Sequence, residues 1–290
     1  MNPNYKILIA TDFSTHSDLA VKIGDNIQRK SGATITLVHI SETSPVWDLP
    51  ATDEQAKNLL GRFQKEINTS IEKSMRDQLL RCNVSAETLI KFGTPQKELL
   101  ELIDSTKPDL LIMGHQGRSG LFSLGSFAEK MIATSPVPVL VGKSLKDIEK
   151  VCCLIDLSKP SREAIDYTKR FAQLFGARAT YLTSISDISS KQNIPFMNSV
   201  FQFSDEERMK IKANAKALIQ KNAGDLSNDE IQVEISPLRI VESLTKSLTE
   251  MEADLAVMSK HNRGPVERFF IGSTSIGILK NFNSNILVLP

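Results

Sequence analysis

The 290-residue chain lacks the features that mark several specialised classes of protein. Its 35 basic and 34 acidic residues leave a net charge of +1 without a long basic block, so charge gives no reason to expect nucleic acid or an anionic membrane as a partner. No apolar run approaches the roughly eighteen residues of a membrane span, and the first residues do not resemble a signal peptide. Only three cysteines occur, which favours small buried core residues in a reducing cytoplasm over a redox or metal site.

Signatures of catalysis are missing as well. No GxxxxGK[ST] motif occurs, so the lysine that grips phosphates in P-loop enzymes is absent, and no GxSxG elbow presents a nucleophilic serine. The four histidines are scattered, and no pair has the spacing of metal ligands; they are His16, His39, His115 and His261. We therefore expect no catalytic residue and no fixed metal site, with any Mg²⁺ arriving on the phosphates of a nucleotide.

The chain repeats itself once. Lys6–Asp12 aligns with Lys150–Asp156 at an offset of 144, and Asp109–Met113 aligns with Asp254–Met258 at an offset of 145. A period this long indicates duplicated domains and not a solenoid. The polar stretch 143–149 separates the copies, so we expect a first domain over 1–142, a linker over 143–149 and a second domain over 150–290.

Each copy alternates short apolar runs with segments of helical periodicity. Alternating strands and helices of these lengths imply a parallel sheet covered on both faces by helices. In the first copy we expect strands over 7–10, 34–40, 84–92, 109–113 and 137–141, and helices over 17–30, 53–81, 95–105 and from 126 onward.

The stretch Asp109–Ser126, DLLIMGHQGRSGLFSLGS, is the first candidate for a site. A buried strand, a glycine-punctuated loop and a helix start follow one another, and this arrangement binds phosphate through close backbone approach and the partial positive charge of the helix N-terminus. The alternative is a tight connection whose glycines serve only turns, because a glycine-rich loop by itself is a weak signal.

Six segments together resemble the universal stress protein family: ILIATDFS, TLVHIS, KFGTP, DLLIMGHQGRSG, LGS and PVPVLV, in this order. The resemblance covers nearly the whole chain as two tandem copies. It implies two doubly wound, Rossmann-like (adenine nucleotide alpha hydrolase-like) domains, each with a five-stranded parallel sheet. In the nucleotide-binding members, ATP lies at the carboxyl ends of the strands, where the switch-point rule also places a ligand.

The resemblance also implies roles for residues of the first copy. Asp12 would bond the adenine or ribose side of ATP, although capping of the next helix, with Ser14 as a second candidate, is an equal alternative. The backbone of Ile40 would contact adenine. Gly114 and Gly117 would let the main chain run close to the ribose and phosphates, and Gly125 and Ser126 would bind the phosphates. The full set expected for this site is Ala10, Asp12, Ile40, Met113, Gly114, Gly117, Gly125, Ser126 and Phe127.

Both copies depart from the family's glycine pattern, in which nine residues separate the second glycine from the Gly-Ser or Gly-Thr pair. Only seven residues, 118–124, do so in the first copy. The second copy keeps nine residues but has Ser259 and Asn262 in place of the two glycines. We expect the first copy to be the better nucleotide site. The expected weaker site comprises Asp156, Ser259, Asn262, Gly272 and Ser273.

Three hypotheses on function remain open at this point. The leading one is a cytoplasmic stress-response protein that binds ATP in its first domain with little or no turnover. The second is a degenerate scaffold that recruits protein partners, or an apolar ligand, without nucleotide; the apolar segment 194–203 would then be a lid, although ordinary packing is the simpler alternative. The third is slow ATP hydrolysis or self-phosphorylation.

The apolar terminal strands bear on assembly. In single-domain members of the family such strands meet across a two-fold axis, and an unpaired edge invites another strand. We therefore expect the strands 137–141 and 286–289 of the two copies to pair internally as a pseudo-dimer, which leaves room for a homodimer of the whole chain.

Overall fold

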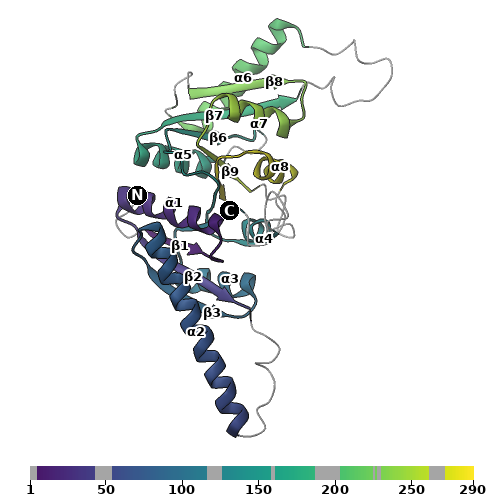
Figure 1. Cartoon of the computed structure of the whole chain (residues 1–290). Helices are drawn as coiled ribbons and strands as arrows, with labels where there is room; N and C mark the ends of the chain where they lie inside the picture. The colour runs from purple at the N-terminus through teal and green to yellow at the C-terminus, as the bar shows by residue number, and fades with distance from the viewer. Residues whose placement is uncertain are drawn as a thin grey trace, which may run out of the picture. The chain divides into compact units, whose positions relative to one another are not determined.

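The computed structural model describes residues 5–42, 54–115, 126–157, 161–186, 203–224, 226, 230–260 and 272–290, with only the backbone of 54–57. The chain divides into two compact units, Met1–Leu145 and Lys146–Pro290. Each unit is an α/β layer structure in which helices flank a sheet (Figure 1). In the described part of the chain, no helix is both long enough and apolar enough to cross a membrane.

The first unit alternates strands and helices throughout. Its elements are β1 (Lys6–Ala10), α1 (Thr15–Ser31), β2 (Thr34–Ser41), α2 (Glu54–Cys82), β3 (Glu87–Phe92), α3 (Pro95–Thr106), β4 (Leu110–Gly114), α4 (Ser126–Thr134) and β5 (Val139–Gly142). The strands lie in the order β3-β2-β1-β4-β5, and every pair is parallel. The predicted five-stranded parallel sheet is therefore confirmed, with the switch in strand order between β1 and β4.

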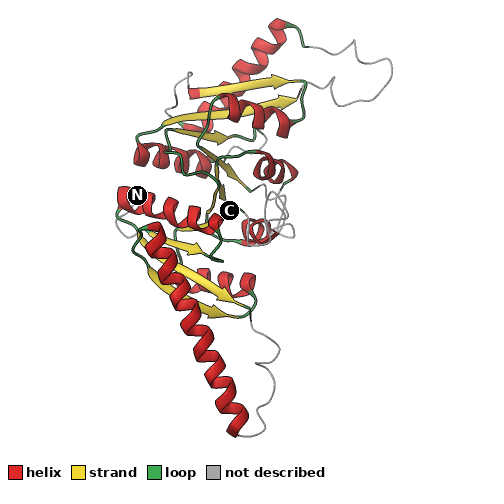
Figure 2. Cartoon of the chain, viewed as in Figure 1, coloured by secondary structure: helices red, strands yellow, loops and turns green. Residues whose placement is uncertain are grey.

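The second unit repeats the same topology (Figure 2). Its elements are β6 (Lys150–Leu154), α5 (Arg162–Phe175), β7 (Arg178–Ser186), α6 (Asp205–Ala223), β8 (Ile231–Ser236), α7 (Ile240–Glu250), β9 (Leu255–Ser259), α8 (Ser273–Asn281) and β10 (Asn285–Leu289). The order β8-β7-β6-β9-β10 is again parallel throughout. β5 and β10 each lie at one edge of the sheet of their own unit, and the pairing expected between them stays a prediction.

The central strands are buried because helices cover both of their faces. Ile9, Leu37 and Leu111 have no exposed surface, and the adjacent Cys152 and Cys153 are buried free thiols. Burial of an aliphatic side chain of this size stabilises a fold by about 1.5–3 kcal/mol. The prediction that the cysteines are core residues is confirmed.

Local signals set the boundaries of the helices and strands, and one strand begins later than expected. Ser14 caps the N-terminus of α1, Gly32 ends it with a left-handed backbone (φ 73°), and Pro95 lies in the first turn of α3. The strand expected from Val84 begins only at Glu87, so that prediction was wrong at its start. The amide of Val84 donates to the carbonyl of Leu79 and so completes the end of α2, which makes it unavailable to the sheet.

Candidate functional site: a cavity at the switch point of the first sheet

A cavity of about 270 Å³ lies at the carboxyl ends of the central strands of the first unit. β1, β2 and β4 end beside it, and the first turns of α3 and α4 close it. Its lining consists of Ala10, Thr11, Asp12, Ser17, Val38, His39, Ile40, Glu42, Pro95, Met113, Gly114, His115, Phe127 and Ala128. The switch in strand order is what opens this crevice, since the connections on its two sides leave in opposite directions.

Most of the residues predicted for the first site meet in this cavity. Six of them line it: Ala10, Asp12, Ile40, Met113, Gly114 and Phe127. Ser126 is the exposed first residue of α4, directly before the lining Phe127. Gly117 and Gly125 lie outside the described residues, as do Arg118 and Gly120 of the shortened loop.

Asp12 takes part in the turn that joins β1 to α1. Its Oδ1 accepts hydrogen bonds from the amide (3.1 Å) and the hydroxyl (2.6 Å) of Ser14, and Ser14 Oγ in turn accepts from the amide of Ser17. Both capping candidates therefore shape this turn, with Ser14 as the cap itself. Phe13 between them has a left-handed backbone (φ 64°), and its ring stacks on His39 at 4.4 Å.

Gly114 is needed at the end of β4 for a reason that involves no ligand. A Cβ at this position would lie 2.7 Å from both the carbonyl carbon and the carbonyl oxygen of His16. Real Cβ atoms essentially never come so close to backbone, so any other residue would push β4 away from the first turn of α1. A substitution of Gly114 would therefore disturb packing as well as any bound molecule.

Three of the scattered histidines gather around the cavity, which sequence spacing did not reveal. His39 and His115 line it, and the rings of His16 and His115 meet edge to face at 4.3 Å. Burial lowers the pKa of His115, the Nδ1 contact with the Gly142 carbonyl (3.1 Å) acts in the opposite direction, and His16 and Lys143 lower the pKa further. Burial, the largest of these effects, therefore favours the uncharged form of His115. The described residues contain no group of three or more His, Cys, Asp or Glu side chains that would hold a metal.

A buried polar network ties the cavity wall to α2. Thr11 Oγ1 donates to the side-chain oxygen of Gln78 (2.7 Å), whose Nε2 donates to Ser17 Oγ (3.0 Å) and Asp18 Oδ1 (2.8 Å). Gln78 has no exposed surface, and Thr11 and Ser17 are almost as deeply buried. Arg81 extends this network by donating two hydrogen bonds to the Asp18 carboxylate. The network fixes the first turn of α1 to the last turns of α2.

Asp18 makes the stability of the first unit depend on pH. Burial would raise the pKa of Asp18, but hydrogen bonds from Arg81 and Gln78 outweigh burial and hold the pKa below its ordinary value of 3.8. Because the folded-state pKa is the lower one, the ionised carboxylate stabilises the fold at neutral pH, and this contribution is lost as the pH falls below about 4. In the variant Asp18→Asn, the free energy of unfolding is expected to decrease less steeply as the pH is lowered below about 4. Urea denaturation at a series of pH values measures this dependence. An equally steep decrease in the variant would contradict this.

Several members of the site have no motif of their own. Thr11, Ser17, His39, Glu42 and His115 were not among the predicted site residues, although all of them line the cavity. The available signal was position, since Thr11 precedes Asp12, His39 precedes Ile40 and His115 follows Gly114. Asp12 and Glu42 give the described lining two carboxylates, and it contains no lysine or arginine.

The described members of the second predicted site lie after β6, at the end of β9 and at the start of α8. Asp156 is exposed after β6, Ser259 ends β9, and Gly272 and Ser273 begin α8, while Asn262 lies outside the described residues. The large groove of this unit, about 1010 Å³, lies along α7 and the start of α8 and is lined by none of them.

Two larger side chains replace those of the cavity wall in the second unit. The strand register, Lys6 to Thr34 in the first unit and Lys150 to Arg178 in the second, sets Leu154 in the place of Ala10. Ile155 likewise replaces Thr11, and Ile155 is buried. The apolar segment 194–203 lies outside the described residues except for Phe203, so its expected role as a lid or packing element stays a prediction.

Comparisons with known proteins agree with the duplicated fold. The family model described as the universal stress protein family matches residues 4–143 and again 147–290. The universal stress protein MJ0531 of Methanocaldococcus jannaschii is 34% identical over 143 residues, which cover 49% of this chain and 83% of that protein.

Solved structures show the same architecture over both copies. A functionally unknown protein, PA1789, from Pseudomonas aeruginosa PAO1 is similar with a TM-score of 0.67 at 16% identity, covering 99% of this chain and 92% of that one. A universal stress protein from Archaeoglobus fulgidus has a TM-score of 0.64 at 16% identity, covering 98% and 97%. With two family matches that together span nearly all its residues, the chain belongs to the universal stress protein family, in a tandem two-domain form.

Proposed function

We propose that this chain is a cytoplasmic stress-response protein that binds ATP in the cavity of its first unit with little or no turnover. The observation that carries the proposal is the convergence of six predicted residues on one cavity at the switch point of a parallel sheet. Two hypotheses compete with it: a scaffold without nucleotide, and slow hydrolysis or self-phosphorylation.

The described half of the cavity suits the nucleoside part of ATP. Ala10, Ile40 and Met113 provide an apolar lining, and Ile40 is the last residue but one of β2. The Asp12 carboxylate lies just beyond the carboxyl end of β1, where it would accept hydrogen bonds from ribose hydroxyls. The adenine would therefore lie between the ends of β2 and β4, with the ribose toward α1.

The phosphates would extend toward the N-terminus of α4. The unpaired amides of a helix start attract phosphate, and Ser126 is the first residue of α4. Because the described lining carries two carboxylates and no lysine or arginine, the charge of the phosphates is best neutralised by a Mg²⁺ ion that they bring with them.

Calorimetric titration of the full chain with MgATP tests the proposal. We expect saturable one-site binding that is weaker than micromolar, because each hydrogen bond to phosphate lost through the shortened loop contributes about 1.5–3 kcal/mol and each 1.4 kcal/mol is about tenfold in affinity. A flat titration, confirmed by ligand-detected NMR at millimolar nucleotide, would favour the scaffold. Steady release of ADP, or labelled protein from γ-labelled ATP, would favour the hydrolytic alternative.

A further inference from the structure

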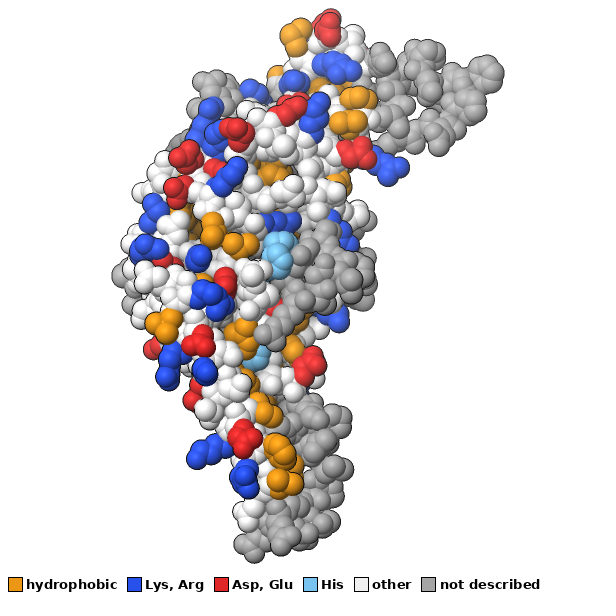
Figure 3. Space-filling view, in the orientation of Figure 1, with side chains coloured by type: hydrophobic (Ala, Val, Ile, Leu, Met, Phe, Trp, Pro, Cys, Tyr) orange, Lys and Arg blue, Asp and Glu red, His pale blue; other side chains and the backbone are white. Residues whose placement is uncertain are grey.

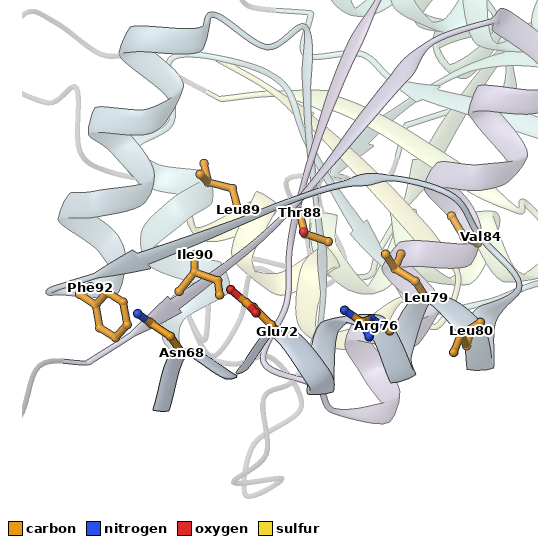
Figure 4. A pocket seen from close by; sticks show the side chains of 10 residues that line it. All are labelled: Asn68, Glu72, Arg76, Leu79, Leu80, Val84, Thr88, Leu89, Ile90 and Phe92. Carbon is orange, nitrogen blue, oxygen red and sulfur yellow. The ribbon is translucent and has the colours of Figure 1, made fainter. Parts of the chain in front are cut away.

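A groove of about 610 Å³ runs between α2 and β3 on the first unit, away from the cavity (Figure 4). β3 and the turn before it contribute Val84, Thr88, Leu89, Ile90 and Phe92, and α2 contributes Asn68, Glu72, Arg76, Leu79 and Leu80. Thr88, Ile90 and Phe92 occupy alternate positions and therefore lie on one side of the strand. The groove thus combines an apolar strand face with polar positions along α2.

β3 leaves an edge of the sheet open. In the part of the chain that the structure describes, it pairs with β2 and with no other strand, and none of its residues is fully buried. The equivalent strand of the second unit, β8, packs against α6 and buries Ile231, Val233 and Ile235. An edge with free amides and carbonyls is a template for a further strand, and β3 is less buried than the equivalent strand β8.

The apolar surface beside this edge extends along α2. Ile71 and Met75 are buried against the unit, but Leu59 and Phe63, earlier on the same stripe, are 53% and 51% exposed, and Leu80 is 72% exposed. Figure 3 shows hydrophobic side chains at the surface toward the protruding end of α2. Leu59 and Phe63 lie near the start of α2 and Leu80 near its end, so apolar side chains are exposed toward both ends of the helix that borders the groove.

Charges of opposite sign are arranged symmetrically on β3, on the side of the strand away from Thr88, Ile90 and Phe92. On β3, Glu87 and Lys91 stand two residues before and two residues after Leu89, on the same side of the strand. A second copy of the strand running in the opposite direction about Leu89 sets each glutamate directly opposite a lysine. Opposite charges in such directly facing positions stabilise a strand pair, and like charges destabilise it.

α2 repeats this arrangement on the groove side. Glu72 and Arg76 are four residues apart on one face, so reversal about Ser74 sets each opposite the other. Figure 4 shows Glu72 between Ile90 and Thr88, and Arg76 beyond Thr88 along the groove. The midpoint of the charged pair on α2 therefore lies beside Thr88, which is next to Leu89, the midpoint of the pair on β3. None of the four charged residues forms a salt bridge within the described part of the chain.

We propose that β3 pairs antiparallel with β3 of a second copy of this chain, about a two-fold axis through Leu89. The two sheets then continue into one another, and the two α2 helices lie antiparallel over the joined strands and cover the groove. An interface of this isologous kind must be self-complementary, and the two acid–base pairs satisfy that requirement at once. A peptide from another protein would need no such symmetry.

Sedimentation of the full chain over a concentration series tests this, with two single charge reversals. The wild-type chain is expected to dimerise. Glu87→Lys and Lys91→Glu should each raise the dissociation constant about tenfold or more, because each reversal replaces two attractive pairs by two repulsive ones. The double variant E87K/K91E restores the pairs and the dimer. Lys246→Glu on α7 of the second unit is a control for net charge and should leave association unchanged.

A mixture of the two single variants gives the sharpest result. E87K presents only lysines and K91E only glutamates at these positions, so equimolar mixing should form a heterodimer that neither variant forms alone. Both side chains lie on the open edge strand, and an unchanged melting temperature will show that the variants fold. A wild-type chain that stays monomeric overturns the proposal and leaves the groove to a different partner. Dimers that persist in both single variants overturn it too, since they place the contact on another face.

Discussion

Replacing Ala10 by leucine is expected to weaken ATP binding about 100-fold while leaving the first unit folded. Ala10 ends β1 and lines the cavity, whose volume is only about 270 Å³. A leucine side chain would stand where the ligand enters, and overpacking of this kind costs about 1–3 kcal/mol. Affinity should therefore fall about 100-fold, since each 1.4 kcal/mol is about tenfold. Titration of the variant with MgATP measures the loss.

The second unit supplies both the rationale and the control for this change. Leu154 occupies the position of Ala10 on the equivalent strand of the second unit, so the fold accommodates leucine there. The reciprocal change, Leu154→Ala, should leave the isotherm as it is in the wild-type chain. If A10L binds ATP normally while L154A loses binding, the nucleotide lies in the second unit and the assignment of the site is wrong.

Replacing Gln78 by alanine should destabilise the first unit by about 2–4 kcal/mol, the largest effect on stability expected from a single polar residue here. The side chain is fully buried, and its loss deprives Thr11 Oγ1 and Ser17 Oγ of a partner. Thr11 Oγ1 and Ser17 Oγ stay bonded to one another, so each lost hydrogen bond costs about 0.5–1.5 kcal/mol, and the cavity left by the missing atoms adds to this. Urea denaturation, fitted to the transition of the first unit, measures the change.

Two variants separate the causes of that loss. Gln78→Met nearly preserves volume and removes the hydrogen bonds, so it should retain the larger part of the effect. Gln64→Ala lies on the exposed surface of the same helix and should change stability by less than about 0.5 kcal/mol. A Q78A variant as stable as Q64A would show that the network contributes nothing net.

The fold could be predicted from sequence because its signals are local. The duplicated strand runs, Gly32 at the end of α1 and Pro95 in the first turn of α3 each reflect a short-range preference that the tertiary structure does not override. The start of β3 was misjudged for the opposite reason. The apolar pattern continues through Val84, and only the hydrogen bond of its amide to Leu79 shows that it belongs to the end of α2.

The site was less predictable because contact, not spacing, defines it. His16 and His115 are 99 positions apart, yet their rings touch because β4 and the first turn of α1 lie side by side. The helix expected over 53–81 likewise did not reveal that Ile71 and Met75 are buried while Leu59 and Phe63 are exposed. A pattern indicates which face is apolar, and the rest of the structure decides what covers that face.

The left-handed backbone of Phe13 has a consequence for how the cavity meets a ligand. A non-glycine residue in this conformation carries strain of about 1–3 kcal/mol, which persists only where surrounding contacts hold it. Here the ring of Phe13 stacks on His39, whose Nδ1 lies 2.9 Å from the carbonyl oxygen of Thr11. The turn beside Asp12 is thus preorganised, and its conformational entropy has already been lost when the chain folds. A molecule that enters the cavity meets a carboxylate fixed in place and does not have to order the turn itself.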